Sequence, residues 1–119
     1  MFPDVDTARQ ELKIAGEMNP GPWIAHSLNV AEAARRIAGA CAPLDSEKAF
    51  VCGLLHDIGR RAGVSATRHI LDGYDYAISQ GWDEVARICL THSFPVKDVD
   101  ASIAKMDISK SQYDFVRNY

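Results

Sequence analysis

Helix-breaking residues divide this 119-residue chain into short segments, and that division constrains the fold more than any other feature. The breaks are NPGP at 19–22, CAPLDSEK at 41–48, the stretch 63–67 and Gly81. Between them, apolar residues recur every three or four positions, as on one face of a helix, and no segment alternates convincingly with the period of a strand. The pattern predicts an all-α fold, a bundle of five to six helices.

The expected helices are bounded by capping residues. They cover about 4–17, 22–40, 47–57, 68–80 and 84–92, and a short last helix begins near Ser109. Pro22 suits a first helical turn, and Gly59 fits the end of the third helix. The expected N-caps are Asp4 or Asp6, Asp45 or Ser46, Ser65 or Thr67, and Asp83.

Composition excludes several classes of partner. A chain of 119 residues predicts one domain, and a net charge of −3 gives no electrostatic reason to expect nucleic acid or an anionic membrane. No apolar run approaches the roughly 20 residues of a transmembrane helix. The three cysteines form no CxxC pair, and their odd number, with no signal-like N-terminus, favours a reducing, cytoplasmic location over a disulfide framework.

The histidines are the unusual feature. His26 continues an apolar stripe made by Trp23, Val30, Ala33 and Ile37, so we expect it to face the core. His92 follows Val85, Ile88 and Cys89 on a similar stripe in the fifth helix.

The remaining two histidines lie at helix ends. His56 and Asp57 flank the predicted buried stripe of the third helix, and His69 lies in the first turn of the fourth. A single inward histidine is usually a core or capping residue that hydrogen-bonds to backbone or carboxylate. Burying all four without a partner would be costly, and a metal is a suitable partner for imidazoles and a carboxylate. Both interpretations stay open at this point.

The sequences "H26SLNVAEAARRIA", "GLLHDIGR", "RHILDGYDYA" and "ICLTHS" resemble the HD-domain, or HDIG-motif, metal-dependent phosphohydrolases, in particular their small single-domain bacterial and archaeal type. The resemblance covers roughly residues 20–95. It implies that His26, His56 and Asp57 are metal ligands and that His69 and His92 complete a two-metal site. It also implies that a metal-activated water attacks phosphorus, with His56 and Asp57 as the catalytic residues.

The resemblance further implies a metal cofactor and residues that contact the substrate. One or two divalent ions of Mn, Fe, Zn, Ni, Co or Mg are expected as cofactor, and His and Asp ligands do not choose among them. Arg60 stands where the family often has Lys or Arg, and Arg60, Arg61 or Arg68 is expected to contact substrate phosphate. The alternative for these arginines is a solvated helix end, or pairing with Asp72 or Asp75.

One family residue has no evident match. The family pattern closes with an Asp on a later helix, and none of the late acids lies in an apolar helical setting: Asp98, Asp100, Asp107 and Asp114. We favour a truncated form of a longer protein that lacks its C-terminal helix or helices. The alternatives are that Asp100, Asp107 or Asp114 folds back as a substitute, or that the site is degenerate and binds metal weakly or not at all.

Three functions follow as hypotheses. The first is hydrolysis of a phosphate ester or anhydride, of a nucleotide or related small molecule. The second is a catalytically impaired HD-like module that binds a nucleotide or a protein in signalling, and the third is a helical interaction protein with structural histidines. The aromatic end "YDFVRNY" adds the expectation of a homo-oligomer.

Overall fold

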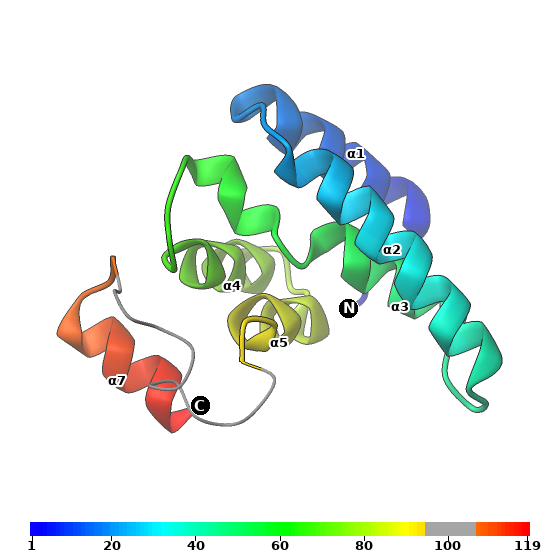
Figure 1. Ribbon diagram of the computed structural model, residues 1–119. Helices are drawn as coiled ribbons and strands as arrows, with labels where there is room; N and C mark the ends of the chain where they lie inside the picture. Colours follow the sequence, from blue (N-terminus) through cyan, green and yellow to red (C-terminus); the bar gives the residue numbers. More distant parts are fainter. Residues whose placement is uncertain (95–106) are drawn as a thin grey trace.

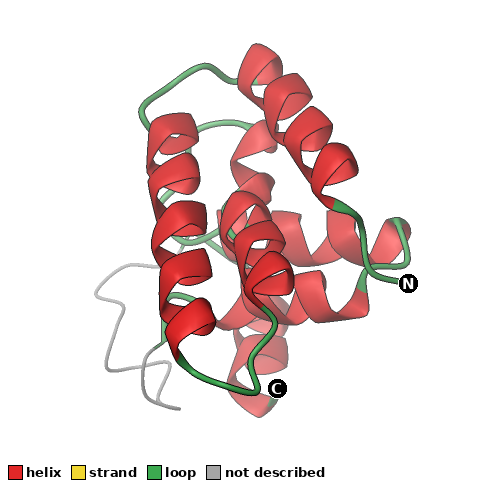
Figure 2. Ribbon diagram, turned by 90° about the vertical axis from the view of Figure 1, so that its right-hand side faces the viewer, coloured by secondary structure: helices red, strands yellow, loops and turns green. Residues whose placement is uncertain are grey.

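Helices make up all the regular secondary structure in the part of the chain that the computed structural model describes, residues 1–94 and 107–119 (Figure 1). They are α1 (Val5–Met18), α2 (Trp23–Ala40), α3 (Ser46–Leu55), the 3-10 helix η1 (Ile58–Ala62), α4 (His69–Ser79), α5 (Asp83–Thr91) and α7 (Lys110–Asn118). The side view in Figure 2 shows the same all-helical arrangement. The predicted all-α fold is confirmed.

Several predicted helix ends are confirmed by their hydrogen bonds. Asp4 accepts the backbone N–H of Thr7 and begins α1, and Asp45 accepts two N–H groups at the start of α3. Ser109 forms a capping box with Gln112 and begins α7. The α4 helix ends at Ser79, shortly before Gly81, whose φ of 79° is a value that glycine adopts without steric cost.

Three predicted ends are wrong, the first at α4, whose capping position is Arg68 rather than Ser65 or Thr67. Asp83 is the first residue of α5 rather than its cap, and the capping position, Trp82, makes no side-chain cap hydrogen bond. The α3 helix ends at Leu55, and Gly59 lies inside η1 without a positive φ. Gly59 is instead a point of close approach, since a Cβ there would lie 1.9 Å from the carbonyl oxygen of His69. The glycine lets η1 cross the start of α4 in backbone contact.

The buried face of α2 also differs from the prediction. The predicted face was Trp23, His26, Val30, Ala33 and Ile37, but His26, Ala33 and Ile37 are exposed and Val30 is only half-buried. The buried residues are Trp23, Ser27, Ala31 and Ala38. The physical reason is close helix packing, which requires small side chains rather than large apolar ones at the contact.

The α2–α3 contact shows this packing directly. A Cβ on Gly53 would lie 2.4 Å from the Cα of Ala31, so the two backbones meet with no side chain between them. In α3 the predicted stripe is buried as expected: Phe50, Val51, Leu54, Leu55 and Ile58. With α1 covering α3 and α5 closing the other side, this stripe forms the centre of the core.

The α7 helix packs on α4 and α5. Val116 and Ile108 contact a buried cluster of Ile70, Leu71 and Leu90. Tyr74 stacks edge-on against the rings of Phe115 and Tyr119. The aromatic C-terminal end therefore has partners within the chain itself. Among the described residues, none of the helices combines the length and the apolar character that crossing a membrane requires.

Candidate metal centre

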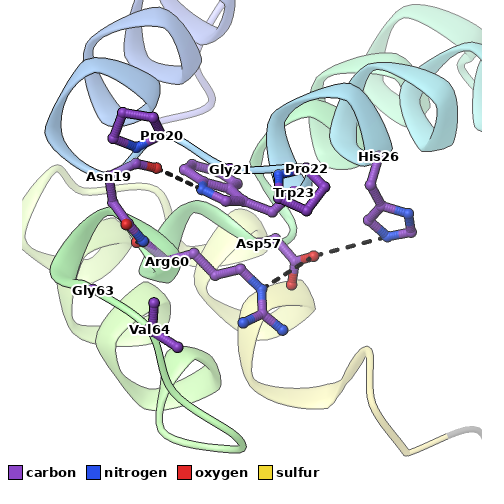
Figure 3. Close-up of a pocket in the computed structure, with 10 residues that line it drawn as sticks. All are labelled: Asn19, Pro20, Gly21, Pro22, Trp23, His26, Asp57, Arg60, Gly63 and Val64. Carbon is purple, nitrogen blue, oxygen red and sulfur yellow. Dashed lines mark hydrogen bonds and ion pairs between the residues drawn. The ribbon is translucent and has the colours of Figure 1, made fainter.

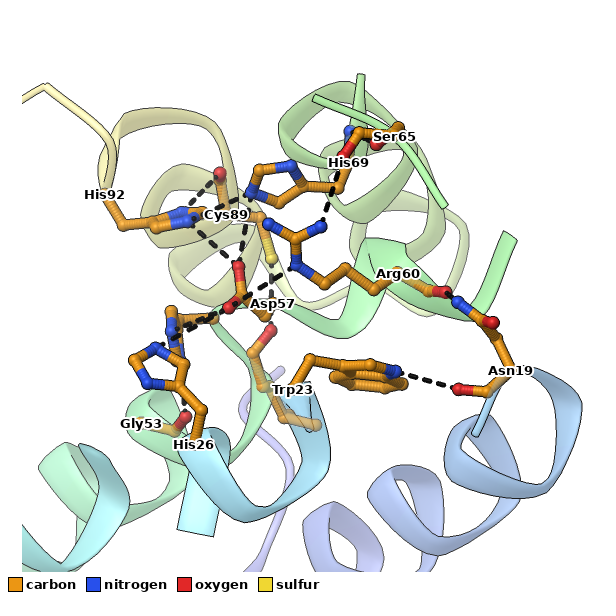
Figure 4. A network of polar contacts seen from close by, with 12 residues as sticks. Asn19, Trp23, His26, Gly53, Asp57, Arg60, Ser65, His69, Cys89 and His92 are labelled. Carbon is orange, nitrogen blue, oxygen red and sulfur yellow. Dashed lines mark hydrogen bonds and ion pairs between the residues drawn. The ribbon is translucent and has the colours of Figure 1, made fainter. Parts of the chain in front are cut away.

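Five side chains from separate elements converge at the end of α3. His56 and Asp57 occupy the junction of α3 and η1, and His69 is the first residue of α4. His26 extends from the first turn of α2, and His92 directly follows α5. Figure 4 shows the imidazoles of His26, His69 and His92 directed toward the carboxylate of Asp57. The structure thus brings together all five residues that the resemblance implied as ligands.

The two oxygens of Asp57 face different histidines. Oδ2 lies 3.2 Å from Nε2 of His56 and 3.8 Å from Nε2 of His26. Oδ1 lies 3.0 Å from Nε2 of His92 and 3.3 Å from Nε2 of His69. One carboxylate therefore lies between two histidine pairs. We call His26 and His56 the His26 half of the cluster, and His69 and His92 the His69 half.

The tautomers of two histidines follow from their backbone contacts. Nδ1 of His56 lies 2.7 Å from the carbonyl oxygen of Gly53, and Nδ1 of His92 lies 2.9 Å from that of Cys89. A carbonyl only accepts, so both Nδ1 atoms carry the proton and donate it. In the neutral ring, Nε2 then presents a lone pair to the oxygens of Asp57, and two acceptors face each other.

The electrostatics of Asp57 reflect this arrangement. The residue is 5% exposed. Burial by itself would raise its pKa, but the imidazoles of His56, His69 and His92 outweigh burial and hold the pKa well below its ordinary value. Burial would lower the pKa of His56, but Asp57 and the Gly53 carbonyl outweigh burial and raise it. The centre favours a carboxylate anion with a positive charge beside it.

A divalent cation fits this donor set. Oδ1 of Asp57 is buried and makes no hydrogen bond of acceptable geometry to a described residue, although two imidazole nitrogens lie within ion-pair distance. Nε2 lone pairs and carboxylate oxygens are ligands of Zn²⁺, Mn²⁺ and Fe²⁺. Imidazoles that donate Nδ1–H to a carbonyl are typical of metal-binding histidines. Two groups have the spacing for an ion, His26–His56–Asp57 and Asp57–His69–His92.

A pocket of about 460 Å³ opens beside the His26 half (Figure 3). Its walls are the α1–α2 turn, η1 and the start of the following loop, with His26, Asp57 and Arg60 on its surface. Asn19 holds the turn against η1, because its Nδ2 donates to the carbonyl oxygen of Arg60 at 2.7 Å. Trp23 Nε1 donates to the carbonyl oxygen of Asn19 at 2.8 Å and fixes the other side of the turn.

The three arginines lie in different places. Arg60 lines the pocket, with Nε 3.8 Å from Oδ2 of Asp57. The guanidinium of Arg61 instead lies over the ring of Tyr76, near Glu11, and does not line this pocket. Arg68 pairs with Asp72 at 3.6 Å, which is the alternative that the sequence left open for it. The structure therefore places only Arg60 of the three beside the cluster.

The late acids do not join the cluster within the described residues. Asp107 does fold back, but its carboxylate accepts backbone N–H groups before α4 instead of facing the histidines. Asp114 pairs with Lys110 on α7 at 3.0 Å. Asp98 and Asp100 lie outside the described residues. Asp57 is thus the single carboxylate in the two groups found in the described part of the chain.

Sequence reasoning missed Asn19 and the pocket role of Trp23. Both belong to the turn that contains NPGP, which the sequence marked only as a break. The signal was present in that motif, since two prolines and a glycine fix the shape of a turn and leave its neighbours free to line a pocket.

Comparison with known proteins identifies the family. The model of the HD domain matches residues 23–110, well over half of the chain, and this range includes all five converging residues. Searches among curated proteins and among solved structures gave no match. The coverage of the family model shows that this chain belongs to the HD-domain family, whose members are mostly metal-dependent phosphohydrolases.

Proposed function

We propose that the protein is a metal-dependent phosphohydrolase that acts on a phosphate ester or anhydride of a small molecule, such as a nucleotide. The observation that carries the proposal is the convergence of four Nε2 atoms on the two oxygens of buried Asp57. A divalent ion supplies a nucleophile at neutral pH and neutralises charge on a phosphoryl group. The cluster supports the binding of such an ion, and the adjacent pocket gives a substrate access to it.

The chain's own residues then have separate roles. His56 and His92 are held with Nε2 available, because backbone carbonyls accept from their Nδ1–H groups. Arg60 directs a permanent positive charge to the pocket, and the carbonyl of Ser65 accepts from its Nη1 at 3.3 Å. We expect its guanidinium to bind the non-bridging oxygens of the phosphoryl group.

The charges of the pocket favour a substrate with few phosphates. Among the described lining residues, Arg60 is the single one with a permanent positive charge. Pro20, Pro22, Trp23 and Val64 give the remainder an uncharged wall. A volume of about 460 Å³ is in the range of small-molecule sites. These features favour one phosphoryl group on an uncharged body over a polyphosphate.

The test is turnover of a substrate panel by the chain after chelation and reloading with Mn²⁺. The panel contains p-nitrophenyl phosphate and nucleoside mono-, di- and triphosphates, and phosphate release is the readout. Asp57→Ala is expected to remove the Mn²⁺-dependent release, and unchanged release in this variant would overturn the role of Asp57. Faster turnover of the triphosphates than of the monophosphates would overturn the proposal that the substrate carries one phosphoryl group.

Arg60→Ala and Arg68→Ala form a matched pair in the same assay. Arg60 borders the pocket, while Arg68 is exposed and pairs with Asp72. We expect Arg60→Ala to raise KM by about tenfold, as the loss of one charge-assisted contact implies. Arg68→Ala should leave KM within about twofold, because exposed ion pairs contribute little.

A second candidate function is a binding module without turnover. It is favoured by one observation, that Asp57 is the single carboxylate of the two groups among the described residues. The same panel separates the two functions when thermal stability is followed beside phosphate release. A ligand that raises Tm without any phosphate release supports the binding module.

The partners of the protein remain proposals as well. A small-molecule phosphate is the partner that the pocket supports, and we propose neither nucleic acid nor membrane as partners. We also propose that the chain forms a homo-oligomer. Phe115 and Tyr119, which suggested an oligomer, contact Tyr74 but keep about two fifths of their surface exposed. Light scattering of the purified chain measures the oligomeric state directly.

A further inference from the structure

The carboxylate of Asp107 binds the backbone just before α4, about forty residues away in sequence. Oδ1 accepts the N–H of Thr67 at 2.8 Å and that of Arg68 at 2.7 Å, and Oδ2 accepts the N–H of Ala66 at 2.9 Å. The N–H groups at a helix start have no partner inside the helix. A carboxylate there also interacts favourably with the helix dipole.

The next N–H group in the chain belongs to His69. It donates to the hydroxyl oxygen of Ser65 at 3.0 Å. Asp107 and Ser65 together thus satisfy four consecutive N–H groups that end at a residue of the cluster. These two side chains therefore help to fix the position of the first turn of α4, beside the backbone contact with Gly59.

His69 depends on this position more than the other buried histidines do. The rings of His56 and His92 are each oriented by a backbone carbonyl that accepts from Nδ1. Nδ1 of His69 is buried and has no hydrogen-bond partner among the described residues. In the described part of the chain, only Nε2 of this ring has polar contacts, 3.3 Å from Oδ1 of Asp57 and 3.4 Å from Nε2 of His92. No described backbone carbonyl orients the ring, so its direction depends more than those of His56 and His92 on where the start of α4 places its backbone.

Asp107 is itself held by its neighbours. Ile108 packs against the buried cluster of Ile70, Leu71 and Leu90, and Ser109 begins the capped helix α7. The contact of Asp107 with α4 is therefore a fixed connection between the C-terminal segment and the cluster.

We infer that Asp107 is a positioning residue: it fixes the first turn of α4 and so holds Nε2 of His69 against Asp57, without being a ligand itself. The inference rests on the proposed metal site. Asp107 then positions a metal ligand, whereas one alternative left open by the sequence was that Asp107 itself replaces the missing ligand.

The test is a double-mutant cycle of Asp107→Ala and His69→Ala, with Mn²⁺ affinity measured by isothermal titration of the full chain. In the wild-type background, Asp107→Ala is expected to weaken Mn²⁺ binding about tenfold, as the loss of an outer-shell contact does. In the His69→Ala background, Asp107→Ala should change the Mn²⁺ affinity by less than about twofold, because Asp107 acts on the ion only through His69. An equal loss in both backgrounds, or no loss in either, overturns the inference.

Asp114→Ala is the matched control, because Asp114 is an acid of the same C-terminal segment whose side chain pairs only with Lys110 in the contacts described. It should leave Mn²⁺ affinity unchanged. If Asp107→Ala does not fold, Asp107→Asn takes its place, since it keeps one accepting oxygen and should give a smaller loss with the same dependence on His69.

A second measurement needs no metal. In imidazole ¹H–¹⁵N spectra of the metal-free chain, Asp107→Ala should shift or broaden the ring signals of His69 and leave those of His56 in place. Unchanged His69 signals overturn the inference even if His69→Ala alone abolishes Mn²⁺ binding. Absence of Mn²⁺ binding by the wild-type chain at millimolar concentration overturns it together with the metal site. Mn²⁺ binding without phosphate release refutes only the proposed hydrolysis.

Discussion

The two halves of the histidine cluster lie at similar distances from Asp57 but in different surroundings. In the His26 half, the side chain of His56 is 8% exposed, but that of His26 is 58% exposed and borders the pocket. In the His69 half, the side chains of His69 and His92 are 6% and 20% exposed. The His26 half, which we call the open half, gives a substrate access. The His69 half, which we call the closed half, is part of the folded interior. Residues of the same type should therefore differ in how much they contribute to stability.

Asp57 belongs to both halves, so its removal should have the largest effect. Asp57→Ala is expected to weaken Mn²⁺ binding at least about a thousandfold, or about 4 kcal/mol, because both groups that could hold an ion lose their carboxylate ligand. Isothermal titration against wild type measures the change, with Asp114→Ala as a control. A loss of less than tenfold would show that the histidines hold the ion without Asp57.

A substitution outside the cluster should also disrupt the closed half, by displacing α4. Gly59→Ala places a Cβ 1.9 Å from the carbonyl oxygen of His69 and 2.4 Å from the backbone N of Gly73, so α4 must move. We expect a loss of about 3 kcal/mol in the free energy of unfolding, measured with urea. Gly39→Ala is the control, since nothing lies within 4 Å of its Cβ, and alanine in a helix should add about 0.5–1 kcal/mol. Equal stabilities of the two variants would contradict the close approach.

Single histidine substitutions compare the halves directly. In the metal-free chain, His69→Ala should cost about 2 kcal/mol of unfolding free energy, because a buried side chain is lost. His26→Ala should cost less than about 0.5 kcal/mol, because the ring is mostly exposed. Chemical denaturation in the presence of a chelator measures both. The comparison fails if His26→Ala is the more destabilising variant.

The sequence predicted those features that depend on neighbouring residues. The helices, their caps at Asp4 and Asp45, the start of the last helix near Ser109 and the buried stripe of α3 all follow from spacing and local hydrogen bonds. The position of His69 in the first turn of α4 was equally accessible. These properties need no knowledge of which helices meet.

Features that depend on contacts between elements could not be predicted. The buried face of α2 is set by the approach of Gly53 to Ala31, which no apolar pattern reveals. Arg60 and Arg61 are adjacent, yet η1 directs one to the pocket and the other to Tyr76. The exposure of His26 follows from the same helix packing, and it is why an expected core residue borders a pocket.

The smallest expected effect is the pH dependence of the contact that fixes the closed half. Burial would raise the pKa of Asp107, but the N–H groups of Thr67, Ala66 and Arg68 outweigh burial and lower it. A lowered pKa means that the stabilisation is complete above the ordinary carboxyl pKa of about 4 and is lost as pH falls through the lowered value. Because Asp107 is exposed, we expect well under about 1 kcal/mol. In urea unfolding of the metal-free chain, wild type should exceed Asp107→Asn in stability at pH 6, and the difference should be smaller at pH 3. A difference that stays constant between these pH values would show that the charge of Asp107 does not hold the start of α4, and that the closed half is stabilised by packing alone.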